Sequence, residues 1–189
     1  MLTNDNWKSS QQSEIEATGL APTDDLESAI VATLEPGNYT AIMRGQNDGT
    51  GVGLVEAYDL GPPGVAQLAN ISTRGFVGTG DNVMIGGIIV GPEEKTSSAV
   101  LLRAIGPSLE NFGVPNPLAD PMFELRDGDG GLNVANDNWK TTQQAEIEAT
   151  GLQPSNDFES ALLMSLTPGS YTAIVRGTND GTGVALVEA

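Results

Sequence analysis

Short runs of alternating apolar and polar residues dominate the second half of the chain. A two-residue period is typical of β-strands with one buried face, and the run 82–90 is apolar almost throughout, which favours a central strand. Glycine, proline, asparagine and aspartate separate the runs, as expected of tight turns. The pattern predicts eight strands, over residues 68–77, 82–90, 99–105, 122–126, 132–135, 159–166, 171–176 and 183–189.

Two short helices are predicted between these strands. Thr141 and Gln144 match a capping box, which predicts a helix over 142–149 that ends at Gly151. A single helical turn is predicted over 108–111. Helical segments are therefore a minor part of the fold.

Turn residues complete the fold prediction. Ser108 is placed to cap the helical turn at its start, and Gly113 is placed to end it. The polar segment 91–97 and the Asp180-Gly181 pair both indicate β-hairpins. Eight short strands with one or two short helices predict an all-β fold, an antiparallel β-sandwich that is jelly-roll-like, with a closed barrel as the alternative.

The chain also contains a long internal repeat. Residues 4–57 return as residues 136–189 without gaps, and 38 of 54 positions are identical. A repeat period of domain size is typical of tandem arrays. We therefore predict two parts, residues 1–57 as the back half of a preceding copy and residues 58–189 as a complete β-sandwich copy, with a first strand that begins near residue 51. A half-copy exposes strand edges and apolar side chains, so it is expected to need a partner, an N-terminal extension or a rearranged packing with the complete copy.

The charge of the chain restricts its function. Eight basic and 25 acidic residues give a net charge of −17, which repels nucleic acid and anionic membrane surfaces and attracts cations. The sequence has no histidine and no cysteine, which excludes a histidine-based triad and a thiol nucleophile. The sequence also lacks an apolar run long enough to predict a membrane-spanning helix. We expect a protein that is not an enzyme and does not insert into membranes or bind nucleic acid.

Two groups of acidic residues are candidate metal ligands. In the first, Asp127 and Asp129 lie in a glycine-rich turn. This turn starts like an EF-hand loop, but its twelfth position is Asn138 rather than glutamate, which excludes an EF-hand. Oxygen-rich loops of a sandwich supply the ligands that Ca²⁺ prefers, although aspartate and glycine are also ordinary turn residues.

The second group is Asp157 and Glu159, two positions apart on a segment predicted to be extended, so that both carboxylates lie on one face. Two adjacent carboxylates are unfavourable without a cation or a basic neighbour. If Asp137 folds over the pair, one Ca²⁺ explains all three, so we predict Asp137, Asp157 and Glu159 as ligands. The alternative is a solvated strand edge or a helix N-cap. The equivalent residues of the half-copy are Asp5, Asp25 and Glu27.

Each repeat copy carries one tryptophan, Trp7 or Trp139, directly after an Asn-Asp-Asn run. An exposed indole ring could stack on a sugar, which would make the protein a carbohydrate-binding module. With so few aromatic residues in each copy, packing in the interior is the favoured interpretation.

Several of these segments resemble known bacterial families. The chain is similar to a tandem repeat domain of bacterial extracellular and surface proteins, through residues 68–90, 101–113, 136–139 and 171–176. Its second half also resembles the pre-peptidase C-terminal (PPC) β-sandwich domains, through residues 123–127, 136–139 and 166–176. These resemblances imply an extracellular or cell-surface location, a stalk or accessory role without catalysis and, for the second family, calcium.

Together these observations predict an extracellular structural protein. We expect β-sandwich copies joined head to tail in a stalk or a self-assembling fibre, stabilised by Ca²⁺, in which the partner is another copy of the repeat and the half-copy is completed by strand complementation. The alternative is a carbohydrate- or surface-binding accessory module with a glycan as ligand.

Overall fold

A computed structural model of the protein describes residues 1–62, 68–91, 97–129 and 131–189. The chain divides into two compact units, Met1–Leu68 and Ala69–Ala189. The boundary lies beyond the predicted one at residue 57, because the described residues that follow the half-copy in the first unit belong to no sheet. Each unit is described separately below.

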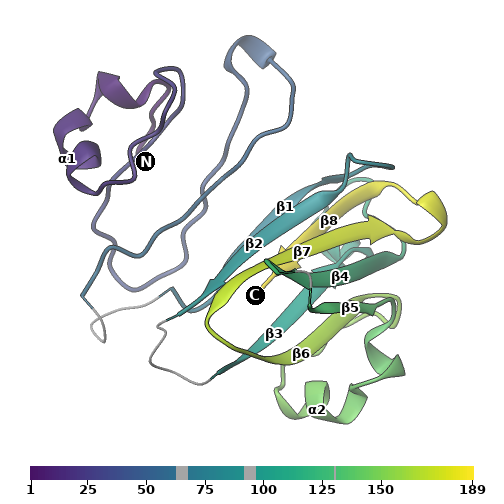
Figure 1. The fold of residues 1–189 in the computed structure, drawn as a ribbon. Helices are drawn as coiled ribbons and strands as arrows, with labels where there is room; N and C mark the ends of the chain where they lie inside the picture. The colour runs from purple at the N-terminus through teal and green to yellow at the C-terminus, as the bar shows by residue number, and fades with distance from the viewer. Residues whose placement is uncertain (63–67, 92–96, 130) are drawn as a thin grey trace. The chain divides into compact units, whose positions relative to one another are not determined.

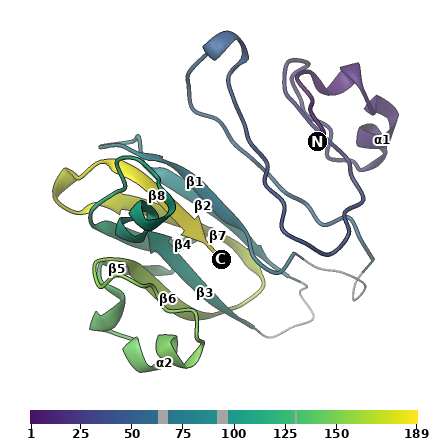
Figure 2. The same cartoon turned by 180° about the vertical axis from the view of Figure 1, so that it is seen from behind.

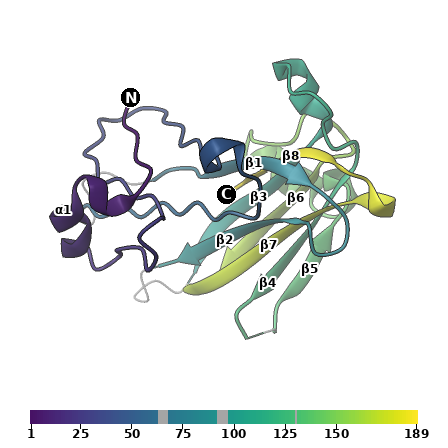
Figure 3. The ribbon, with the colours of Figure 1, turned by 90° about the horizontal axis from the view of Figure 1, so that it is seen from above.

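The second unit is a sandwich of two antiparallel sheets, which confirms the predicted fold class. Its strands are β1 (Ser72–Val77), β2 (Met84–Val90), β3 (Ser98–Ile105), β4 (Pro121–Asp127), β5 (Asn133–Asn136), β6 (Ser160–Leu166), β7 (Gly169–Gly177) and β8 (Gly183–Glu188). One sheet has the order β1-β8-β3-β6 and the other β2-β7-β4-β5 (Figure 1). Figure 3 shows the second sheet in front, with its four strands side by side in that order.

Consecutive strands alternate between the two sheets, with one exception. Only β4 and β5 are successive strands that pair with each other among the described residues. Asp180-Gly181 is therefore not the predicted hairpin, because it joins β7 in one sheet to β8 in the other. The left-handed conformations of Asn179 (φ 54°) and Asp180 (φ 58°) turn the chain sharply at this corner. The hairpin predicted over 91–97 falls mostly outside the described residues, and it joins β2 and β3, which also lie in different sheets.

The hydrophobic core lies between the sheets. In the second sheet Phe123 and Leu125 of β4 face inward beside Val175 and Ala173 of β7, and all four side chains are fully buried. Full burial of one large apolar side chain contributes about 1.5–3 kcal/mol. The alternation that the sequence shows in these strands is therefore the alternation between core and solvent.

One strand prediction was wrong in its placement. The almost continuously apolar sequence of β2 predicts a central strand, but β2 is an edge strand whose Ile85 and Ile89 are exposed. Gly86 of β2 faces inward, toward the opposite sheet, and a larger residue would be crowded there. A Cβ atom there would lie 3.3 Å from Cγ1 of Val187 in the opposite sheet, so glycine allows the two sheets to approach.

The helical segments of this unit lie outside the sheets. They are η3 (Pro107–Phe112), η4 (Trp139–Thr141), α2 (Gln144–Ala149) and η5 (Thr178–Asp180), and Figure 2 shows α2 beside β6. Gly151 ends α2 in the left-handed conformation (φ 69°), as predicted. The predicted capping box is not formed, because the Thr141 hydroxyl donates to the Asn138 carbonyl instead. Ser108 is not an N-cap either, since η3 begins after Gly106.

The first unit reproduces the local structure of the second over residues 5–27. Its η1 (Trp7–Ser9) and α1 (Gln12–Ala17) correspond to η4 and α2. The Trp7 amide donates to the Glu27 carbonyl at 2.8 Å, as Trp139 does to Glu159 at 2.9 Å. These contacts join residues that lie within one copy of the repeat, so each copy contains every group that forms them.

The rest of the half-copy folds differently from its counterpart. No residue from 28 to 56 is in a strand, although the equivalent residues form β6, β7 and β8; the segment contains only the short η2 (Gln46–Asp48). The strand predicted to begin near residue 51 is therefore absent, and the sandwich begins with β1 at Ser72. The physical reason is that β6, β7 and β8 each pair with a strand between β1 and β4, and the sequence of those strands occurs once in this chain.

The two ends of the sandwich meet. The Ala189 amide donates to the Ile71 carbonyl at 3.0 Å, and the Ile71 amide donates to the Ala189 carbonyl at 3.1 Å. The chain therefore enters this unit next to its last residue. Among the described residues, no helix has the length and apolar character needed to cross a membrane.

Candidate functional site

The three predicted ligands Asp137, Asp157 and Glu159 do not share a site. Residues 156–159 form a turn rather than the predicted extended segment, because the Asn156 side-chain oxygen accepts the Phe158 amide at 3.0 Å. Asp157 consequently points to solvent, where it pairs with Lys140 at 2.5 Å. Glu159 is completely buried. The two carboxylates thus have opposite environments.

Glu159 is held by four donors in the interior of the sandwich unit. One carboxylate oxygen accepts the backbone amides of Gly106 (3.2 Å) and Ser108 (2.9 Å) and the Ser108 hydroxyl. The other oxygen accepts the Asn156 amide at 3.2 Å. Several donors to one charged group satisfy a buried carboxylate without a cation. Glu159 therefore fixes the start of η3 to the turn before β6, and it does not fit the role of a metal ligand.

Asp137 forms part of a different acidic pair. Its two oxygens accept the Thr178 hydroxyl at 2.8 Å and the Asn138 side-chain amide at 3.2 Å. Asp120 lies nearby, and its Oδ1 atom is buried without a hydrogen-bond partner. Burial raises the pKa of the Asp120 carboxyl above its ordinary value of 3.8, the charge of Asp137 raises it further, and a hydrogen bond with Thr178 acts in the opposite direction. No sequence signal points to Asp120, because its partners Asp137 and Thr178 lie far along the chain.

Replacing Asp120 with asparagine should raise the melting temperature at neutral pH. A carboxyl group whose pKa is raised on folding adds to the free energy of unfolding. This contribution is complete below pH 3.8, the ordinary pKa of the group, and it is lost as the pH rises through the pKa in the folded protein. The ionised carboxylate is therefore unfavourable at about pH 7, and the variant lacks it. Melting curves of both proteins between about pH 3 and pH 7 test this, with the difference expected to disappear at the acid end. A difference that does not depend on pH would contradict it.

Asp127 and Asp129 lie at the turn between β4 and β5, beside a cavity of about 210 Å³ that residues 167–171 also line. One oxygen of Asp127 accepts the Leu132 amide at 2.8 Å, and the other is buried without a partner. A buried carboxylate oxygen without a donor is compatible with a cation. Of the predicted ligands, this pair fits a metal ion best.

The half-copy places its equivalent residues apart as well. Asp5 accepts the Gln46 side-chain amide at 3.0 Å, and Asp25 pairs with Lys8 at 2.5 Å. Glu27 is exposed and accepts the Asp24 amide at 3.2 Å. Over the described residues of both units, no three acidic side chains gather in a cluster that could hold a metal ion. Calcium binding therefore stays a prediction, and a single ion shared by Asp137, Asp157 and Glu159 does not fit this arrangement.

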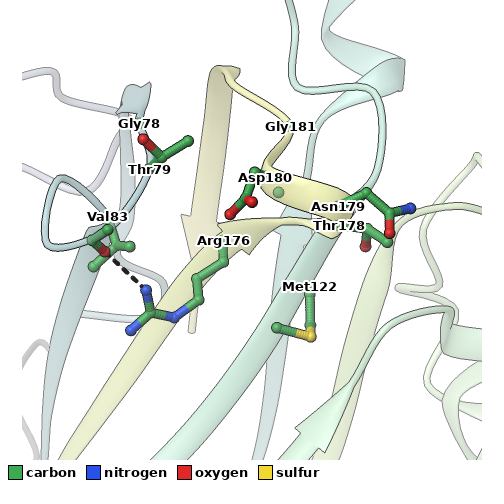
Figure 4. Close-up of a pocket in the computed structure, with 11 residues that line it drawn as sticks. Gly78, Thr79, Val83, Met122, Arg176, Thr178, Asn179, Asp180 and Gly181 are labelled. Carbon is green, nitrogen blue, oxygen red and sulfur yellow. Dashed lines mark hydrogen bonds between the residues drawn. The ribbon is translucent and has the colours of Figure 1, made fainter.

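A larger depression of about 310 Å³ lies between the β7–β8 corner and the turn before β2 (Figure 4). Arg176 extends across it and donates to the Gly80 carbonyl at 3.0 Å, while a second nitrogen lies 3.7 Å from Glu124. Asp180 lies at the corner side of this depression. The guanidinium group is thus already bound by the protein, so it acts as a structural link between β7 and the turn.

Both tryptophans are interior residues, as favoured from the sequence. Trp139 is 3% and Trp7 5% exposed, and each indole N–H donates to a backbone carbonyl at 3.1 Å. Neither ring is available to stack on a sugar. This removes the main sequence argument for a carbohydrate-binding module.

Comparisons with known proteins give one structural match. No protein family matches the sequence, and no curated protein matches it. The crystal structure of the pre-peptidase C-terminal domain of a collagenase from Bacillus anthracis is similar, with a TM-score of 0.40 and 11% identity; the alignment covers 64% of this chain and 89% of that one. The strand pairing of this chain by itself shows the sandwich fold.

Proposed function

We propose that this chain is a non-catalytic structural repeat protein of the bacterial exterior, in which β-sandwich copies follow one another along a stalk. The observation that carries the proposal is the repeat of residues 4–57 as 136–189. The two copies have the same local structure wherever the contacting residues all belong to one copy. A protein that repeats a whole domain multiplies its length without adding a new site. The resemblance to bacterial surface repeats supports the location.

The meeting of the two ends of the sandwich determines how successive copies are connected. Because Ile71 and Ala189 are hydrogen-bonded, each copy adds to the chain at one point rather than at opposite poles. Residues 58–70 separate the end of one copy from the first strand of the next. This segment can span at most about 45 Å, which limits how far apart neighbouring copies can lie.

Calcium is proposed as a stiffening ion at the turn that holds Asp127 and Asp129. The support is the buried Asp127 oxygen that has no donor, together with the net charge of −17, which a bound cation partly neutralises. Asp127 supplies the buried ligand and Asp129 the exposed one. The location at the β4–β5 hairpin restricts any effect to one edge of the sandwich.

Small-angle X-ray scattering of a protein with three consecutive copies tests the stalk. The expected result is an elongated particle with evenly spaced bodies, also visible by electron microscopy, and a melting temperature that falls when EDTA removes calcium. The same protein with Asp127→Asn should not respond to EDTA. A compact particle would overturn the stalk, and an equal EDTA response of both proteins would overturn only the ion site.

A further inference from the structure

The half-copy exposes the residues that the complete copy buries. Tyr39 is 58% exposed and its counterpart Tyr171 8%; Met43 is 55% exposed and Val175 0%. The other large exposed residues with buried counterparts are Ile30, Leu34 and Val55, equivalent to Leu162, Leu166 and Val187. Residues 28–56 thus carry the inward face of three strands without the strands that cover it.

We infer that residues 4–57 bind a second front half of this repeat, a polypeptide with the sequence of residues 69–135, which would convert 28–56 into three strands. This inference rests on the tandem-repeat function proposed above. The register of the complete copy, transferred to the half-copy, predicts the pairing. Val52 would pair with the partner's equivalent of Phe76, as Val184 does with Phe76, and Met43 with its equivalent of Phe123, as Val175 does with Phe123.

A polar contact adds specificity to this apolar surface. In the complete copy the front half supplies the Gly106 and Ser108 donors that hold Glu159. Glu27 has the same position in the half-copy but is exposed, and the amide that it accepts is that of Asp24, within the half-copy itself. A front half would therefore bring both the missing sheet partners and three further donors for this carboxylate.

The numbers of half-copies identify the partner. Residues 1–189 contain one front half and two back halves, so exchange between two copies of this stretch leaves one back half uncovered in each. Association of this chain with itself by strand exchange therefore completes no additional sandwich. The partner that completes an additional sandwich is a front half that is not already paired with a back half.

The test is an extended protein in which the sequence of residues 69–135 is joined directly before Asn4, as Ala135 is joined to Asn136. Amide hydrogen exchange should show slow exchange over 28–34, 37–45 and 51–56, and the calorimetric enthalpy of unfolding should rise about twofold because it scales with the number of folded residues. The extended protein with Met43→Asp is the control and should show neither change. Fast exchange over 28–56 in the extended protein would overturn the inference.

Disulfide trapping distinguishes the partner, since the protein has no cysteine of its own. The Val184 amide donates to the Asn116 carbonyl, and the Val184 carbonyl accepts the Leu118 amide. Val184 therefore has no backbone hydrogen bond to Phe76, the residue opposite it in β1. In such non-hydrogen-bonded pairs the two Cα atoms lie closer together, which suits a disulfide. In the extended protein, Val52→Cys should cross-link to cysteine at the added equivalent of Phe76. In the original chain, Val52→Cys with Phe76→Cys should stay reduced, and a 52–76 bond within or between chains would overturn the inference.

The two proposals fail separately. Slow exchange over 28–56 together with a compact three-copy particle would overturn the stalk but support the pairing. Fast exchange over 28–56 together with an elongated particle would overturn the pairing but support the stalk.

Discussion

Replacing Glu159 with alanine should lower the free energy of unfolding of the sandwich by about 3–5 kcal/mol, the range for breaking a buried charged contact. The variant leaves the amides of Gly106, Ser108 and Asn156 without their acceptor in a buried place. It also leaves a cavity where the side chain was completely enclosed. Urea unfolding followed by tryptophan fluorescence and by circular dichroism measures the change.

The repeat supplies a matched control for this prediction. Glu27→Ala changes the same residue in the same local sequence, but Glu27 is exposed, so the expected change is within about 0.5 kcal/mol. Glu159→Gln keeps an acceptor for the Ser108 donors and should lie between the parent and Glu159→Ala. Equal effects of Glu27→Ala and Glu159→Ala would show that the buried contacts contribute little.

The positions of the strands in the complete copy could be predicted because they depend on local alternation. The predicted run 99–105 corresponds to Ser98–Ile105, and the run 171–176 to Gly169–Gly177. The pairing of these strands could not be predicted in the same way. β3 pairs with β6 and β8, from which long stretches of chain separate it, and no local signal encodes such contacts.

The half-copy shows the limit of local signals more directly. Over 28–56 it has nearly the same apolar pattern as β6–β8, yet it forms no strand, because a strand edge needs a hydrogen-bonding partner. Its glycine-rich corner does form in both copies. A Cβ on Gly45 would lie 1.9 Å from the Gly49 carbonyl oxygen, and one on Gly177 would lie 2.1 Å from that of Gly181. Such a turn is closed by its own backbone and requires nothing from a distant strand.

The three residues predicted to share one ion lie apart for a related reason. Spacing alone places Asp157 and Glu159 on one face, but the Asn156 side chain forms a turn that separates them. Ser108, which binds Glu159, carries no sequence signal beyond that of a helix cap. Its location in the first turn of η3 brings it to Glu159 from 51 positions away, through the pairing of β3 with β6. Asp120 and Thr178, which surround Asp137, come together through the pairing of β4 with β7.

Replacing Val175 with aspartate should abolish cooperative unfolding of the sandwich. Val175 is fully buried and lies in register with Met84 on one side and Phe123 on the other. An unpaired carboxylate there has no donor and displaces core packing, at a cost that exceeds about 5 kcal/mol and so approaches the whole stability of a domain. Circular dichroism during heating should show no sharp transition.

Met43→Asp changes the equivalent residue of the half-copy and should alter stability by less than about 0.5 kcal/mol, because Met43 is largely exposed. The contrast between the two variants follows from a single difference, the presence of β2 and β4 beside one copy of the strand. A large loss of stability from Met43→Asp would mean that residues 28–56 are already covered, which would also remove the reason for a second front half. If both variants are mild, the core between the sheets tolerates charge, and the alternating pattern from which the strands were predicted has another cause.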